Sequence, residues 1–290
     1  MAALSMVKGH GTENDFLLVA DPDGTVQLDA ATVAHWCDRQ RGIGADGLIV
    51  AAPGPLAGYE TGAAWFMDYR NADGSLAEMC GNGIRVLVAF LRHRGLVQLA
   101  DGDSVLIATR GGDRRVWVSG DGYTVDMGDF SLPGGTEATL RGFDVAVKLP
   151  GLDQRPGLRV AMPNPHTVVA LGSIADLEGL VLEGVHYDPE PAEGTNLEVV
   201  VPLGETPEGR GALRMRVLER GVGETRSCGT GCCAAAVAVR EWAGAGAPDE
   251  WDVTVPGGML RVRVDGQRVL LTGPAVLVAE VTPLDVPPAP

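Results

Sequence analysis

Short apolar runs separated by turn signals dominate the hydrophobic pattern of the chain. Each run has the length and residue types of a β-strand, and turn residues such as Asn71-Ala72-Asp73-Gly74 lie between the runs. The pattern therefore predicts a protein built mainly of strands. We expect strands at 16–20, 48–52, 64–69, 105–109, 115–118, 123–127, 144–149, 158–162, 167–171, 196–201, 213–218, 252–255, 260–264, 269–271 and 275–281.

Four segments break this pattern and predict helices, each preceded by a residue whose side chain can cap a helix. The predicted helices are 30–40 after Asp29, 84–94 after Asn82, 174–182 after Ser173 and 231–243 after Thr230. The second and the fourth are apolar nearly all round. Such helices are enclosed by other structure rather than lying on a surface.

The two apolar helices follow the same motif. Cys80-Gly81-Asn82-Gly83 opens the first and Cys228-Gly229-Thr230-Gly231 opens the second, at an offset of 228 − 80 = 148 residues. A repeated unit of this size predicts a duplicated α+β fold, in which many strands surround one buried helix in each half and the site lies between the halves. We expect one domain at 1–131 plus about 274–290 and the other at 132–273, with a linker near 131–136.

Charge and composition narrow the function classes. The net charge is 23 − 38 = −15, which disfavours binding to nucleic acid. The chain has no apolar run long enough to span a membrane and no visible signal peptide, and its five cysteines are an odd number. Together these features predict a cytoplasmic protein with free thiols.

Cofactor motifs are missing or occur in the wrong context. Neither of the two lysines lies in a Gly-Lys-Ser/Thr loop, and two lysines make a pyridoxal enzyme a poor hypothesis. The Gly-x-Gly-x-x-Gly segment at 42–47 follows a predicted helix and precedes a strand, the reverse of the dinucleotide fingerprint. Zinc is also disfavoured, because no Cys-x-x-Cys occurs and no histidine lies near the cysteines at 228, 232 and 233. We therefore expect no cofactor and no metal.

Cys80 and Cys228 differ from the other three cysteines, which we expect to pack as small apolar residues. Each lies where a helix begins, and the positive end of a helix favours a thiolate. The flanking glycines allow a ligand to approach backbone amides that can bind a carboxylate. Two such thiols in equivalent positions suggest a cofactor-free racemase or epimerase, in which one thiolate removes a proton and the opposite thiol donates one.

Several longer motifs resemble the diaminopimelate epimerase family, and the match runs in order from about residue 8 to residue 280. These motifs are Gly9-His10-Gly11-Thr12-Glu13-Asn14-Asp15-Phe16, Asn71-Ala72-Asp73-Gly74-Ser75, Met79-Cys80-Gly81-Asn82-Gly83, Asn164-Pro165-His166 and the run from Glu219 to Gly231. The resemblance implies two barrel-like domains, each with a mostly antiparallel sheet around a central helix. It also implies conversion of LL-2,6-diaminopimelate to the meso form, without pyridoxal or metal, for lysine and cell-wall precursor synthesis.

The resemblance also assigns roles to individual residues. Cys80 and Cys228 match the two acid/base thiols, Glu219 matches a substrate-binding residue near one thiol, and His166 matches a residue near the other. The remaining positions match residues that hold the substrate, namely Asn14, Asn71, Gly81, Asn82, Asn164, Asn196, Arg220, Gly229 and Thr230. Arg220 suits the distal carboxylate, because a guanidinium can bind it as a fork, and the asparagine oxygens suit the ammonium groups.

The chain departs from the family at three positions, and two hypotheses compete with the epimerase. Glu13 stands where relatives frequently have Gly, and Cys232 where they frequently have a small residue. Many relatives carry a substrate-contacting Gln where this chain has Gly47. A related proline or hydroxyproline racemase would usually show His in place of Asn82 and would not need Arg220. A non-catalytic thiol switch or binding protein would exchange no proton on any amino acid. The expected partner is a small-molecule substrate rather than nucleic acid or a membrane, and a homodimer is left open.

Overall fold

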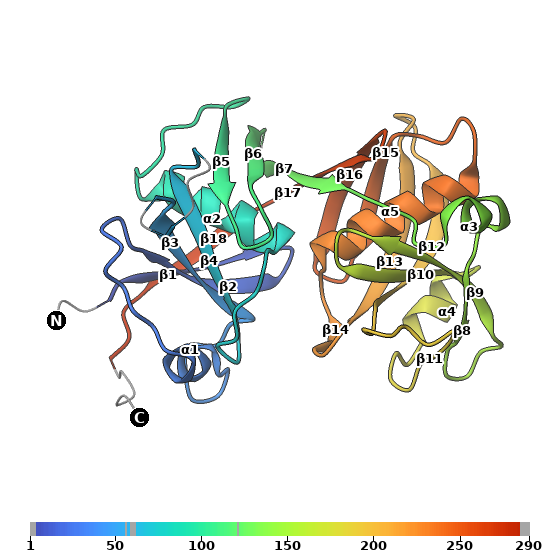
Figure 1. Cartoon of the computed structure of the whole chain (residues 1–290), viewed down its shortest axis with the longest axis horizontal. Helices are drawn as coiled ribbons and strands as arrows, with labels where there is room; N and C mark the ends of the chain where they lie inside the picture. The colour runs from blue at the N-terminus through green and yellow to red at the C-terminus, as the bar shows by residue number, and fades with distance from the viewer. Residues whose placement is uncertain (1–3, 56, 59–61, 121, 285–290) are drawn as a thin grey trace. The chain divides into compact units, whose positions relative to one another are not determined.

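The computed structural model describes residues 4–55, 57–58, 62–120 and 122–284, which form two compact units (Figure 1). The first unit extends to Val125 and takes up the chain again from Gly273, and the second is Asp126–Thr272. The sequence placed the corresponding boundaries at residues 131 and 274. Strand β7 (Gly122–Asp129) runs through the first boundary without a turn, so no turn signal marks this position.

The first unit is a mostly antiparallel sheet with two helices. Its strands pair in the order β18–β1–β2–β3–β4–β5–β6–β7, and only β2–β3 and β4–β5 are parallel. Its further elements are β1 (Met6–Gly11), β2 (Asn14–Ala20), α1 (Ala30–Cys37), β3 (Gly47–Pro53), β4 (Trp65–Asn71), α2 (Gly81–His93), β5 (Ser104–Ala108), β6 (Arg114–Ser119) and β18 (Val276–Val281).

The second unit repeats this arrangement. Its strands pair in the order β11–β8–β9–β10–β12–β13–β15–β16–β17, with only β10–β12 and β13–β15 parallel, and β14 pairs with β13. Its elements are α3 (Gly135–Arg141), β8 (Val145–Lys148), β9 (Arg155–Ala161), β10 (Pro165–Ala170), α4 (Ile174–Glu178), β11 (His186–Asp188), β12 (Asn196–Glu205), β13 (Gly211–Glu219), β14 (Gly223–Thr225), α5 (Gly229–Ala243), β15 (Glu250–Val255), β16 (Gly258–Asp265) and β17 (Arg268–Gly273). The two parallel pairs fall at equivalent places, which confirms the predicted duplicated α+β fold.

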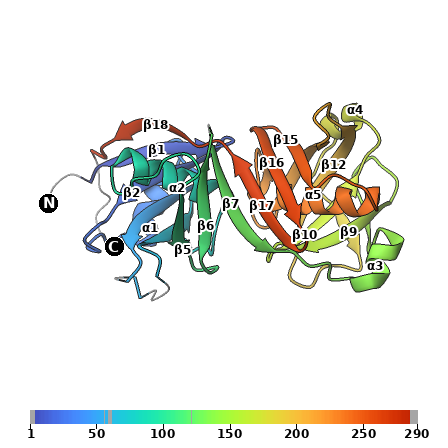
Figure 2. The ribbon, with the colours of Figure 1, turned by 90° about the horizontal axis from the view of Figure 1, so that it is seen from above.

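Each unit encloses one apolar helix (Figures 1 and 2). Helix α2 contacts β1, β2, β3, β4, β6 and β18, and α5 contacts β9, β10, β12, β13, β15 and β16. Every residue of α2 from Gly81 to Leu91 is buried, and so is every residue of α5 from Gly231 to Val239. The prediction that these helices are wrapped by other structure is therefore confirmed.

The remaining helices are shorter than predicted or were missed. Asp29 and Ser173 cap α1 and α4 as expected, but α1 ends at Cys37 rather than residue 40, and α4 ends at Glu178 because Gly179 follows. Helix α3 was not predicted. It begins within the segment expected to be a linker, at the last residue of a Leu-Pro-Gly-Gly run (132–135) that is typical of a loop.

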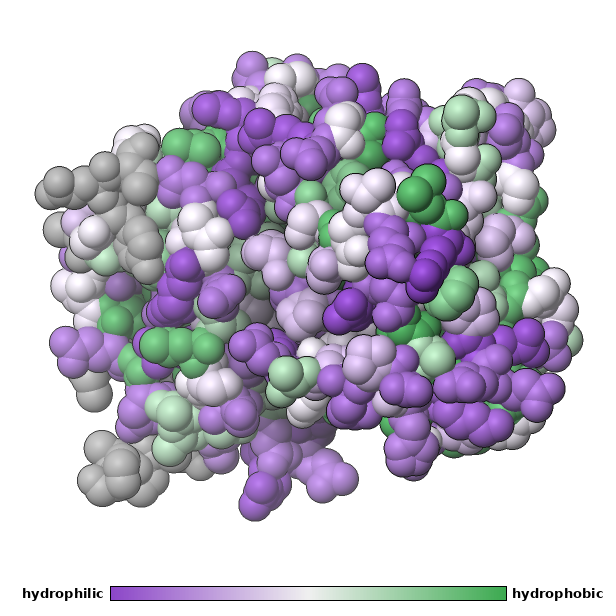
Figure 3. Space-filling model, turned by 45° about the vertical axis from the view of Figure 1, so that its right-hand side comes forward, coloured by the Kyte–Doolittle hydropathy of each residue, from purple (hydrophilic) through white to green (hydrophobic). Residues whose placement is uncertain are grey.

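The surface and the helix lengths add two observations. On the face drawn in Figure 3, hydrophilic residues cover most of the surface and hydrophobic ones are scattered. Within the described part of the chain, no helix is both long and apolar enough to cross a membrane.

Candidate active site

Each of the two candidate cysteines is itself the N-cap of the central helix that follows it. Cys80 and Cys228 have extended backbones, with φ −137° and ψ 121° at the first and φ −123° and ψ 116° at the second. The Sγ atom of Cys80 accepts a hydrogen bond of 3.4 Å from the N–H of Gly83, and that of Cys228 accepts one of the same length from Gly231. The expected caps Asn82 and Thr230 were therefore wrong. The actual caps lie two residues earlier, so Asn82 and Thr230 fall in the first turn of their helices.

In the first unit, the side chain of Asn14 faces this helix start. Its Oδ1 accepts from the thiol of Cys80 at 3.5 Å and from Nδ2 of Asn82 at 3.2 Å. Its Nδ2 donates to the carboxylate of Asp46 at 2.8 Å. The amide therefore has one orientation, because only its oxygen can accept and only its nitrogen can donate.

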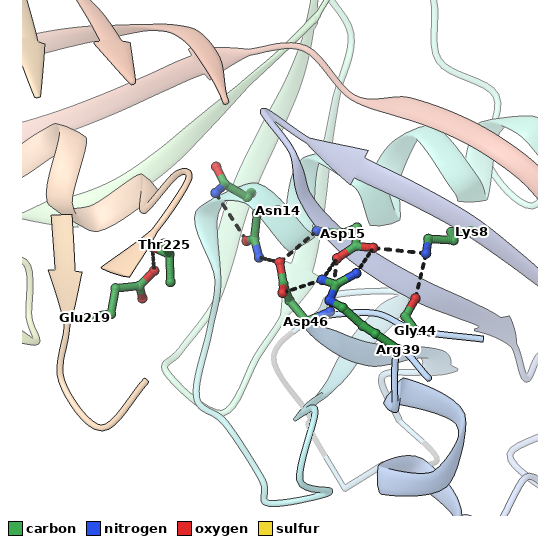
Figure 4. A network of polar contacts seen from close by, with 9 residues as sticks. Lys8, Asn14, Asp15, Arg39, Gly44, Asp46, Glu219 and Thr225 are labelled. Atoms are coloured by element: carbon green, nitrogen blue, oxygen red, sulfur yellow. Dashed lines mark hydrogen bonds and ion pairs between the residues drawn. The ribbon is translucent and has the colours of Figure 1, made fainter. Parts of the chain in front are cut away.

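A charged network holds Asp46 in turn (Figure 4). Arg39 bridges Asp46 and Asp15 with Nη2–oxygen distances of 2.8 and 2.6 Å, and Lys8 pairs with Asp15 at 3.1 Å. Burial alone would raise the pKa of Asp15, but hydrogen bonds from Arg39 and Lys8 hold it below its ordinary value. Asp15 and Asp46 are thus both paired with cations, and Asn14 is anchored to a fixed charge.

Asn71 and Gly47 lie opposite each other where β4 pairs with β3. Nδ2 of Asn71 donates to the hydroxyl of Ser75 at 3.0 Å, so this side chain stabilises the turn after β4. A Cβ atom at Gly47 would lie 2.5 Å from the carbonyl oxygen of Arg70 and 2.8 Å from the ring of Tyr69. A side chain here, such as the Gln that the family resemblance led us to expect, would not fit this backbone without a shift.

In the second unit, Cys228 is surrounded by acidic and hydroxyl groups. Its thiol hydrogen-bonds Glu219, which also accepts from the hydroxyl of Thr225. Burial raises the pKa of the Cys228 thiol well above its ordinary value, and the carboxylates of Glu219 and Glu198 add to this effect. Burial likewise raises the pKa of Glu219. The expectation of a thiolate-prone Cys228 was therefore wrong for this arrangement, because burial and two acids outweigh the helix amides.

A chain of polar side chains also reaches Cys228 from β10. Nε2 of His166 lies 3.1 Å from Oδ1 of Asn164, and Nδ2 of Asn164 donates to the hydroxyl of Thr230 at 3.3 Å. The hydroxyl of Thr230 lies 3.5 Å from the sulfur of Cys228. Three residues that the sequence singled out are thus joined to one thiol. The assignment of Glu219 and His166 to different thiols stays a prediction.

Asn196 and Arg220 are joined through the backbone. Oδ1 of Asn196 accepts from the backbone N–H of Arg220 at 2.9 Å, and its Nδ2 donates to the carbonyl of Pro165 at 3.2 Å. The guanidinium of Arg220 donates to the carbonyl of Glu193 at 2.6 Å, and this side chain is exposed. Asn196 therefore fixes the base of Arg220, whose substrate role remains a proposal.

Sequence reasoning missed two acidic residues in these networks. Asp46 lies in the glycine-rich loop that was set aside as a failed dinucleotide motif, and Glu198 follows Asn196 by two residues on β12. The period of two in a strand, which places residues 196 and 198 on one face, was the available signal for Glu198.

The sequence of the chain is similar to those of known proteins over most of its length. The sequence model of the diaminopimelate epimerase family matches residues 6–133 and 159–278. A diaminopimelate epimerase of Streptomyces coelicolor is 44% identical, over 96% of this chain and 94% of that protein. One from Thermobifida fusca is 42% identical, over 96% of this chain and 97% of that protein.

Solved structures show a similar fold at low sequence identity. A Bacillus anthracis phenazine biosynthesis protein of the PhzF family has a TM-score of 0.67 at 16% identity, covering 98% of this chain and all of that one. A hydroxyproline epimerase from Agrobacterium vitis, solved with trans-4-hydroxy-L-proline, has a TM-score of 0.65 at 14% identity, covering 98% and 93%. At these identities the likeness shows the fold alone.

Proposed function

The chain belongs to the diaminopimelate epimerase family, and from that premise we propose that it converts LL-2,6-diaminopimelate to meso-diaminopimelate with Cys80 and Cys228 as its acid/base pair. The assignment of the two thiols as a pair rests on their equivalent positions in the two units. Each thiol is the N-cap of the buried central helix in one of two duplicated units. The two hypotheses of another amino-acid racemase and of a non-catalytic thiol protein give way to this function.

The proposed reaction moves one proton at each face of the substrate α-carbon. One cysteine, as a thiolate, takes the α-proton and becomes a thiol, and the electron pair stays on the substrate as a carbanion. The other cysteine, as a thiol, gives its proton to the opposite face and becomes a thiolate. Atoms and charge balance. The two cysteines end the reaction with their protonation states exchanged, and proton exchange with solvent must restore their starting states before the next LL substrate reacts.

Stabilisation of the carbanion is the difficult part of this reaction, because an amino-acid C–H is very weakly acidic. We assign the substrate carboxylate next to the reacting carbon to the helix starts at Gly81-Asn82 and Gly229-Thr230. Amide N–H groups at a helix N-terminus favour negative charge and are already oriented before the charge develops. Such stabilisation by the protein itself supports a mechanism without pyridoxal or metal.

The distal end of the substrate sets specificity in this proposal. Arg220 binds the distal carboxylate, while Asn14, Asn71, Asn164 and Asn196 supply oxygens for ammonium groups or hold their neighbours. Glu219 and His166 act as auxiliary groups near the thiols. A substrate without a second carboxylate loses this charge-assisted fork, so it should bind less tightly. A proline-like substrate has no second carboxylate for Arg220.

We further propose the cytoplasm as the compartment of this enzyme. None of the five cysteines forms a disulfide bond, as expected of a protein in a reducing environment. The small-molecule substrate is the proposed partner. A homodimer remains to be tested by the mass of the protein in solution.

Replacement of either thiol by alanine tests the assignment. In Cys80→Ala and Cys228→Ala, kcat/KM for the LL to meso conversion should fall on the order of a hundredfold or more, because each variant lacks one proton-transfer group. The fold should survive, as measured by thermal unfolding.

Cys37→Ala is the matched control. Cys37 is the last residue of α1 and is buried in the core, and burial raises the pKa of its thiol to about 12. Its replacement should leave turnover unchanged, at a packing cost of roughly 1 kcal/mol. Near-parental turnover in either of the other two variants would refute the two-thiol assignment.

A further inference from the structure

Glu198 on β12 is a fully buried carboxyl group beside the turn that carries Cys228. Its side chain is inaccessible to solvent, and its Oε1 lies 2.7 Å from Nδ1 of His166, which is equally buried. Its Oε2 has no hydrogen-bond partner among the residues that the structure describes. A buried carboxylate with an unpartnered oxygen is costly unless a neighbour neutralises its charge. The cost of burying Glu198 therefore depends on where the neighbouring protons lie.

The contact on the Nε2 side of the His166 ring fixes the position of one of these protons. Asn164 donates through Nδ2 to Thr230, so its Oδ1 points towards Nε2 of His166 at 3.1 Å. An amide oxygen only accepts hydrogen bonds. With the amide in this orientation, Nε2 of His166 must carry a proton.

The contact between Glu198 and His166 then requires a second proton. If Nε2 is protonated and the ring is neutral, Nδ1 is an acceptor, and the carboxyl group must donate to it as a neutral acid. If the ring is a cation, Nδ1 donates to a carboxylate. In both cases one shared proton lies between Oε1 and Nδ1, and the pair has no net charge.

The chain of hydrogen bonds continues in the same direction from Asn164 to the sulfur of Cys228. The hydroxyl of Thr230 accepts from Asn164, so its own proton is available for Sγ of Cys228 at 3.5 Å. Glu198 also lies directly against this helix start. A Cβ atom at Gly231 would be 2.7 Å from its Oε1 and 3.3 Å from Cβ of Cys228.

We propose that Glu198 is a positioning residue for Cys228. It acts by holding a proton between its own Oε1 and Nδ1 of His166. That proton holds His166 in the Nε2–H form, which orients Asn164 and directs the hydroxyl of Thr230 towards the sulfur. A hydroxyl that donates to sulfur stabilises a thiolate relative to a thiol. This inference rests on the proposed function of Cys228 as an acid/base group.

Two variants of similar size separate proton donation from simple packing. In Glu198→Gln the amide N–H can still donate to Nδ1, so the Nε2–H form of His166 should persist and kcat should stay within about threefold of the parent. Glu198→Met fills the space without a donor. Its kcat should fall at least about tenfold, within the range seen when an outer partner of a functional group is lost, with KM changed less than threefold. Thermal unfolding reports whether each variant is folded.

The tautomer of His166 provides a readout that needs no substrate. Nitrogen-15 NMR of the histidine rings, assigned with a His166→Gln variant, should show Nε2 of His166 protonated in the parent and in Glu198→Gln but not uniformly so in Glu198→Met. A parent ring protonated at Nδ1 alone would overturn the inference. So would parental kcat in Glu198→Met, or equal losses in both variants. If the parent fails to epimerise diaminopimelate, the proposed function is wrong, while the NMR result still decides the role of Glu198.

Discussion

At the residue scale, the orientation of Asn14 depends on the charge of Asp46. Its carboxylate accepts from Nδ2 of Asn14 at 2.8 Å and pairs with Arg39 at the same distance. In Asp46→Asn one of the two oxygens becomes an N–H₂ group that cannot accept, so the contacts with Asn14 and Arg39 cannot both persist. Asn14 then loses the contact that directs its Oδ1 towards Cys80. We expect kcat/KM to fall about tenfold, or roughly 1.4 kcal/mol of transition-state stabilisation.

Asp38→Asn is the matched control for this change. Asp38 also pairs with an arginine, Arg41, but it lies in the turn after α1, and its carboxylate accepts hydrogen bonds from Gln40 and Arg41 of that turn. Its replacement should leave kcat/KM unchanged. Parental kinetics in Asp46→Asn, together with an unchanged melting temperature, would show that Asp46 does not position Asn14.

At the element scale, the two central helices begin in the same way but have different neighbours. A Cβ atom at Gly83 would lie 3.0 Å from the ends of Ile49 and Met67, which can shift, whereas one at Gly231 would meet Glu198 at 2.7 Å. Gly83→Ala should therefore change the stability by about 1 kcal/mol or less, because overpacking offsets the better helix propensity of alanine. Gly231→Ala should instead lower kcat at least about tenfold, because it displaces Glu198.

Gly83→Ala and Gly231→Ala serve as controls for each other, because both add one methyl group at the same position of equivalent helices. Steady-state kinetics and thermal unfolding of each should be measured side by side. Equal kcat values in the two variants would contradict the special role given to the neighbourhood of Gly231.

The elements themselves were largely accessible to sequence analysis, but their ends were not. The period and apolar character of α2 and α5 identified two enclosed helices, and Asp29 and Ser173 marked real caps. Cap preferences pointed to Asn82 and Thr230 because asparagine and threonine are common caps. In the structure the caps are instead the cysteines two residues earlier, and the turn that begins each helix also positions the cysteine sulfur.

At the scale of the whole molecule, the repeated motif predicted the duplication that the matching strand orders confirm. Contacts between distant residues could not be predicted in this way. Glu198 and His166 are 32 residues apart, and Asn14 and Asp46 are also 32 apart, so only the register of β10 with β12 and the loop before β3 bring them together. The raised pKa of Cys228 has the same origin, because burial and acidic neighbours are properties of the folded unit.

Isotope exchange tests the central claim of two thiols acting on one carbon most directly. The protein is incubated with LL-2,6-diaminopimelate in D₂O, and substrate and product are separated at low conversion and analysed by mass spectrometry and NMR. The account predicts meso product with one deuterium at the epimerised carbon, delivered by the opposite thiol, while the remaining LL substrate stays largely unlabelled. Product that keeps its original α-proton would indicate a single base, and a lack of both meso product and exchange would contradict the account.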